Sequence, residues 1–116
     1  MPRDPDTSER AFHELVRVLE VAAQAGADSV ELEWEGRDLA VYQFFGNTGL
    51  GSVPIPEELQ SAVLEEVVQR AGLRRKSKGR MLLTLNGEEY EVLVKEHDSF
   101  GESAFVLKLK KGGRPR

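Results

Sequence analysis

The fold is decided by residues 28–45, which read DSVELEWEGRDLAVYQFF. In the first half of this stretch, apolar side chains alternate with glutamates, as in a strand with one buried and one solvated face. The apolar set is Val30, Leu32 and Trp34. A tight turn follows over residues 35–38, and residues 39–45 return as a second, more apolar strand. The stretch therefore predicts two strands of an antiparallel sheet, with Trp34 on the buried face.

Helical spacing is found on both sides of this pair of strands. Apolar residues recur every three or four positions over residues 8–25, and Gly26 follows where a helix would end. Residues 46–52 are rich in glycine and indicate a flexible loop. A second amphipathic helix is expected to begin near Pro56 and to end at Gly72.

The last third of the chain predicts three more strands. Residues 81–85 and 88–95 alternate in polarity on either side of Asn86-Gly87, which is a strong hairpin signal. We expect residues 96–102 to form a loop and residues 103–110 to form the last strand.

The predicted order of elements is α-β-β-α-β-β-β. This order indicates an α+β fold in which an antiparallel sheet is packed by two helices. The length of 116 residues fits one domain. We expect that domain to span residues 8–110, with a flexible arm at 1–7 and a flexible basic tail at 111–116.

The composition excludes several kinds of site. The chain has no cysteine, which removes disulfides, thiolate zinc sites, iron–sulfur clusters and a cysteine nucleophile. It has no apolar run of the length needed for a membrane span or a signal peptide. We therefore expect a cytoplasmic protein without membrane insertion. The formal net charge of −4 argues against a dedicated nucleic-acid binder.

No motif indicates catalysis. The glycine-rich residues 46–52 lack the lysine of a Walker phosphate-binding loop. His13 and His97 are too far apart in sequence to give a metal-binding spacing. The three glutamates of residues 31–35 are typical of a solvated strand face, although they would also suit a cation or a basic partner. We expect no enzymatic activity, no cofactor and no metal site.

The clearest charged feature is a run of basic residues after the second helix. It contains no acidic residue and comprises Arg74, Arg75, Lys76, Lys78 and Arg80. A further basic group occupies residues 108–116. Three interpretations are open: a solvated loop and tail, a surface for a protein partner with an acidic face, or a nucleic-acid patch. The absence of interleaved aromatic residues argues against the last of these.

Three segments of the chain, taken together, resemble one known domain. Residues 25–33 read AGADSVELE, residues 79–83 and 90–94 read GRMLL and YEVLV, and residues 101–109 read GESAFVLKL. In order and approximate spacing they are similar to the GASDIHIEP, DGR-hairpin-VDLRVS and GE-x-x-VLRLL segments of the domain that precedes the motor in type II secretion and type IV pilus ATPases. The resemblance extends over residues 11–110.

The resemblance implies a small PAS-like domain. In the secretion ATPases this domain packs on the motor of a neighbouring subunit, and its arginines help to complete the nucleotide site. Residues 39–46 of this chain contain no arginine where the family has several, and the sequence contains no Walker loop. The resemblance therefore implies a non-catalytic protein-interaction or adaptor domain. The alternative is a PAS-like module that binds a small ligand in an apolar pocket.

The expected partner is a protein, either a secretion or pilus ATPase or a second copy of the chain. In the family, the segments that correspond to the basic run and to the Gly101-Glu102 turn lie near the motor interface. The expected partner-binding residues are therefore Arg74, Arg75, Lys76, Lys78, Arg80, Gly101 and Glu102. An acidic face on the partner would complement the cations.

The missing Walker loop leads to a first prediction. The purified chain should neither bind nor hydrolyse ATP, because no lysine follows the glycine loop to hold the phosphates. Isothermal titration calorimetry at millimolar nucleotide checks the binding. Micromolar affinity there would contradict the prediction and would identify residues 46–52 as a phosphate site.

Overall fold

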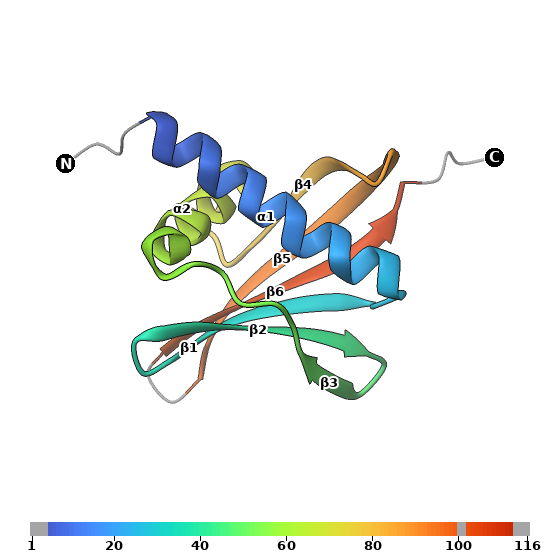
Figure 1. Ribbon diagram of the computed structural model, residues 1–116, viewed down its shortest axis with the longest axis horizontal. Helices are drawn as coiled ribbons and strands as arrows, with labels where there is room; N and C mark the ends of the chain where they lie inside the picture. The colour runs from blue at the N-terminus through green and yellow to red at the C-terminus, as the bar shows by residue number, and fades with distance from the viewer. Residues whose placement is uncertain (1–4, 100–101, 113–116) are drawn as a thin grey trace.

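Two helices pack on one face of a six-stranded antiparallel sheet in the computed structural model, which describes residues 5–99 and 102–112 (Figure 1). Along the chain, the elements are α1 (Pro5–Ala25), β1 (Ser29–Glu35), β2 (Asp38–Phe45), β3 (Thr48–Gly51), the 3-10 turn η1 (Glu57–Leu59), α2 (Gln60–Ala71), β4 (Lys78–Leu85), β5 (Glu88–Ser99) and β6 (Glu102–Lys111). This arrangement confirms the predicted α+β class with two helices.

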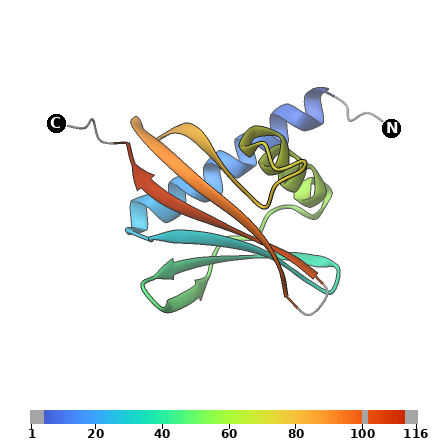
Figure 2. The same cartoon turned by 180° about the vertical axis from the view of Figure 1, so that it is seen from behind.

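The strands lie in the order β3-β2-β1-β6-β5-β4. The centre of the sheet is therefore the pair β1 and β6, in which Val30 lies opposite Leu107 and Leu32 opposite Phe105. β3 and β4 are the two edge strands. In Figure 2 the molecule is seen from behind, with the strands in front of the helices.

The hydrophobic core lies between the sheet and the two helices. Leu19 of α1, Val63 of α2, and Leu32 and Leu107 of the central strands are each 0 % exposed. Burying a side chain of this size contributes about 1.5–3 kcal/mol. Trp34, expected on the buried face of β1, is half-buried and packs against this core.

The order of elements differs from the prediction by one strand. Residues 46–52 were expected to form a loop, but Thr48–Gly51 pairs with the end of β2 as β3. Gly46 turns the chain at a φ of 63°, and the ring of Phe44 packs where Gly49 has no side chain. A Cβ at Gly49 would lie 2.7 Å from the Phe44 ring. Glycines have low strand propensity, so the composition of residues 46–52 did not indicate a strand. The pairing places Gly49 directly opposite Phe44.

Several boundaries also differ from the predicted ones. β4 begins at Lys78 rather than at residue 81, so Lys78 and Arg80 lie in the strand and not before it. α1 begins at Pro5 rather than at residue 8, and the expected loop at 96–102 consists largely of strand, because β5 continues to Ser99 and β6 begins at Glu102. Residues 1–4 and 113–116, predicted to belong to the arm and the tail, lie outside the described residues. In residues 5–99 and 102–112, neither helix has both the length and the apolar character that a membrane crossing requires.

The start of β4 packs directly against the end of α2. Gly72 closes α2 in the left-handed conformation with a φ of 71°, and the Leu73 N–H then donates to the Val68 carbonyl at 2.9 Å. A Cβ at Gly79 would lie 1.9 Å from the Ala71 carbonyl oxygen. Only glycine lets the backbone of β4 approach the helix end so closely.

A second prediction follows from this close approach. Gly79→Ala should lower the free energy of unfolding by about 1–3 kcal/mol or more, since backbone must shift to admit the methyl group. Gly51→Ala is the matched control in the other edge strand, where nothing lies within 4 Å of the added Cβ, and it should cost less than about 0.5 kcal/mol. Urea unfolding followed by Trp34 fluorescence measures both. Equal stabilities would contradict the prediction.

Candidate functional site

The basic run spans the connection between α2 and the edge strand β4 together with the first three residues of that strand, and we call residues 74–80 the basic segment. The connection is anchored at Leu73, whose side chain is buried, and the Lys76 N–H donates to the Leu73 carbonyl at 3.3 Å. Beyond this anchor the five basic side chains, Arg74, Arg75, Lys76, Lys78 and Arg80, are all exposed. The local fold therefore presents the cations to solvent at one edge of the sheet.

Most of this charge is not neutralised within the described residues. Arg80 Nη1 donates to Glu91 Oε2 on β5 at 2.6 Å, and the Arg80 side chain remains 67 % exposed. For the other four cations, the part of the chain that the structure describes offers no ion pair. The basic segment thus carries surplus positive charge that is available to an outside anion.

The predicted second part of this site, the Gly101-Glu102 turn, is only partly described. Gly101 lies outside the described residues, whereas the backbone of Glu102 opens β6 opposite Ser99. The Glu96 N–H donates to the Ser77 carbonyl at 2.8 Å, which ties the basic segment to β5. Ser99 is three residues further along β5, or about 10 Å at the usual rise of a strand. The two predicted parts therefore lie at the same end of the sheet.

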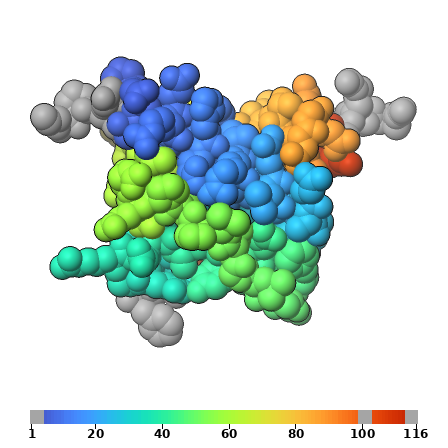
Figure 3. All heavy atoms as spheres, viewed as in Figure 1, coloured from blue at the N-terminus to red at the C-terminus, as the bar shows by residue number. Residues whose placement is uncertain are grey.

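A groove between α1 and β4 was not foreseen from the sequence. This helix-side groove has a volume of about 420 Å³, and its walls include Phe12 and Val16 of α1 and Leu83 of β4. Figure 3 shows α1 in blue beside the β4–β5 hairpin in orange. At one end the two elements are clamped together, because the Asn86 N–H donates to Glu20 Oε2 at 2.9 Å and Asn86 Nδ2 donates to the Glu20 carbonyl at 3.1 Å.

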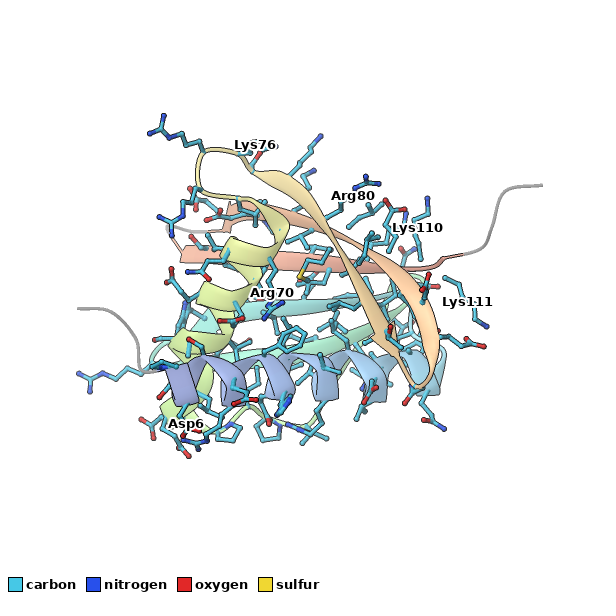
Figure 4. All side chains as sticks on the ribbon, turned by 90° about the horizontal axis from the view of Figure 1, so that it is seen from above. Asp6, Arg70, Lys76, Arg80, Lys110 and Lys111 are labelled. Atoms are coloured by element: carbon cyan, nitrogen blue, oxygen red, sulfur yellow. The ribbon has the colours of Figure 1, made fainter. Side chains whose placement is uncertain are left out.

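Arg70 of α2 lies next to Phe12, one of the walls of this groove. Its guanidinium carbon is 3.7 Å from the centre of the Phe12 ring, and its Nε donates to Glu66 Oε1 at 2.8 Å. In Figure 4 the labelled Arg70 lies in the opening framed by α1, α2 and β4. A cation held over an aromatic face stabilises that arrangement, so Arg70 fixes the position of Phe12 between the two helices.

A second hollow lies along β4, next to Arg80 and Leu82. It has a volume of about 390 Å³, and it shares Leu83 and Thr84 with the helix-side groove. Leu82 is 74 % exposed. The only sequence signal for this feature is Leu82-Leu83, two consecutive leucines that an alternating strand must place on opposite faces.

The glutamates of β1 lie on the sheet face that is turned away from the helices. Glu31 is half-buried, and this burial raises its pKa above the ordinary value; the carboxylate of Glu33 adds to the rise and His97 opposes it. Glu35 accepts a hydrogen bond from the Tyr42 hydroxyl at 2.5 Å. Among residues 5–99 and 102–112, no three His, Asp or Glu side chains are grouped so that they could hold a metal ion.

No protein-family model matches the chain, and no curated protein matches it either.

The raised pKa of Glu31 gives a third prediction. At pH values below its ordinary pKa, Glu31 is protonated in both the folded and the unfolded state, so its ionisation does not change the free energy of unfolding. As the pH rises through the raised folded pKa, the cost of ionising a half-buried carboxyl appears and stability is lost. The free energy of unfolding of Glu31→Gln, relative to that of the unmodified chain, should therefore increase from about pH 4 to about pH 7.

Urea unfolding at both pH values measures this difference. Glu65→Gln, at an exposed position on α2, controls for the loss of one surface charge. If the stability difference caused by Glu31→Gln is flat with pH or shrinks as the pH rises, the burial of Glu31 is not a cost to the fold.

Proposed function

We propose that this chain is a non-catalytic protein-interaction domain that binds an acidic partner through the basic segment and the adjoining edge strand β4. The observation that carries the proposal is the surplus positive charge at 74–80, which lies next to an edge strand with an exposed leucine. Charge complementarity of this kind raises association rates and fixes the orientation of the partner.

We further propose that the chain is a stand-alone relative of the domain that precedes the motor in type II secretion and type IV pilus ATPases, acting as an adaptor for such a motor or for a second copy. The support is the resemblance of the three sequence segments. One of these segments contains Gly79, and the structure explains the glycine there, because a Cβ at this position would collide with the Ala71 carbonyl. Most of the Arg80 side chain is exposed, although its Nη1 is paired with Glu91, and so it can be reached by a partner.

A small-ligand function of the PAS-like kind has less support. The sheet side chains that would line its pocket, Val30, Leu32 and Leu107, are 0 % exposed, so no water-sized space touches them. A ligand could enter there only if the helices moved away from the sheet, at a cost in buried apolar surface. We therefore favour a surface contact over an interior pocket.

A fourth prediction tests the proposed function. The double reversal Arg75→Glu and Lys78→Glu should lower the association rate with a captured partner by about tenfold or more, because long-range attraction is replaced by repulsion. The fold should be unaffected, since both side chains are exposed. The partner is captured from a lysate, identified by mass spectrometry, and its association rate is then measured by surface plasmon resonance at low and high salt.

The matched control is Arg10→Glu with Arg37→Glu, which makes the same change in net charge at exposed positions on α1 and in the turn between β1 and β2. Equal association rates for the two double variants would refute the assignment to the basic segment. Duplex DNA is run in the same format. If DNA affinity, and not protein capture, is what the double reversal abolishes, the protein-partner proposal is wrong.

A further inference from the structure

The backbone of β4 presents a row of hydrogen-bonding groups at the open edge of the sheet. Across the two-residue turn Asn86-Gly87, Leu85 and Glu88 form a hydrogen-bonded pair, and such pairs alternate along an antiparallel ladder. The Glu96 N–H donates to the Ser77 carbonyl. Ser77 is eight residues before Leu85, so this bond fits the same alternation of every second residue. The odd-numbered residues of β4 therefore bond to β5. The groups that face the open edge belong to Lys78, Arg80, Leu82 and Thr84.

The two hollows flank this row of backbone groups. The helix-side groove lies toward α1, and the second hollow lies toward Arg80 and Leu82. Figure 4 looks onto the β4 edge, with α1 on one side and Lys76, Arg80 and Lys110 on the other. Since side chains of a strand alternate between faces, a strand laid beside β4 would direct successive side chains in turn toward the helix-side groove and toward the face that carries Lys78 and Arg80.

The two sides differ in chemistry. The groove toward α1 exposes parts of Phe12, Val16 and Leu83, which are half-buried apolar side chains. On the other side, Lys78 and Arg80 point their side chains to the face away from the helices, because they alternate with the buried Met81. Opposite charges directly across two strands stabilise the pair. Glu89 and Glu91 of β5 also line the second hollow, and Glu91 pairs with Arg80, so the positive charge on this face is strongest at Lys78 and the preceding residues of the basic segment. This surface thus suits a segment with apolar residues on one face and acidic residues opposite the start of β4.

We propose that an acidic, extended segment of a partner protein adds to β4 as a further strand of the sheet. Its apolar side chains enter the helix-side groove, and its acidic side chains lie opposite Lys78 and Arg80. This inference rests on the proposed function and specifies its mode of recognition: backbone hydrogen bonds give affinity, and alternate side chains give specificity. A second copy pairing through its own β4 would bring another basic segment to the contact, which like-charge repulsion disfavours.

The probe is a capped peptide of alternating valine and glutamate with eight residues, the length of β4. A labelled copy should bind the full chain in a fluorescence anisotropy titration. A matched peptide of alternating valine and lysine should bind about tenfold more weakly or not at all.

Backbone methylation tests strand addition directly. In antiparallel addition the glutamate N–H groups face β4, whereas the valine N–H groups face solvent; in parallel addition the two sets exchange roles. N-methylation of one set should lower the affinity about tenfold or more, because several hydrogen bonds are lost together. Methylation of the other set should change the affinity by less than about threefold.

A pair of variants tests the same point from the side of the protein. Leu82→Pro removes an N–H that faces the open edge and leaves the ladder to β5 intact, as prolines do in edge strands. Leu82→Ala removes the side chain and keeps the N–H. Binding should fall about tenfold further in the proline variant than in the alanine variant. Circular dichroism and melting temperature establish that both variants fold, and the methylated peptides give the answer if the proline variant does not.

Each outcome decides between the two proposals. If both methylated peptides bind as tightly as the parent, while Arg75→Glu with Lys78→Glu abolishes binding, strand addition is wrong and the acidic-partner function stands. If methylation matters but charge reversal does not, β4 accepts a strand and the acidic-partner function is wrong. Failure of the valine–glutamate peptide to bind overturns strand addition, and the association rate of the captured partner then decides the acidic-partner function. A dimer in analytical ultracentrifugation that Leu82→Pro dissociates would identify a second copy as the occupant and overturn the assignment to a partner protein.

Discussion

The antiparallel pairing of β1 with β6 is the interaction on which the rest of the molecule depends. It joins the first strand of the chain to the last, so the remaining strands can only be added outward from this pair. Val30, Leu32 and Leu107 form the part of the sheet on which the buried stripe of α1 rests. Once this pair is set, β2 and β5 have defined neighbours, and β3 and β4 become the edges. The position of the basic segment at a sheet edge is thus a consequence of the central pair.

Local pattern was sufficient for the elements whose polarity alternates or repeats clearly. The glutamate alternation of β1, the helical stripes and the Asn86-Gly87 turn all predicted structure that is present. Local sequence pattern gave the wrong prediction where contacts with another strand decide the conformation. β3 was missed because glycines have no strand preference of their own, and the contact of Gly49 with the ring of Phe44 forms only when the two strands pair. Residues 96–99 were expected to be a loop because they are polar, yet they pair with the start of β6.

The candidate site, too, could be found in advance only where a single stretch of sequence carries it. A run of cations is visible in any sequence, and residues 74–80 are exposed as expected. The groove is built by residues that are distant in the chain: Glu20 and Asn86 are 66 positions apart, and their contact exists only after the sheet has placed β4 beside α1. No periodicity within either segment carries that information. The groove became apparent only when the topology was known.

The contact between Glu20 and Asn86 also bounds the helix-side groove at one end. α1 and β4 meet there, and in Figure 4 their ribbons diverge from the hairpin turn toward the labelled Arg70. Both hydrogen bonds are donated by Asn86, one from its backbone and one from its side chain, and Glu20 is itself a wall of the groove. The spacing of helix and strand at this end therefore depends on one polar residue on each element. A change at either residue would alter the end of the groove without removing a side chain from the buried core.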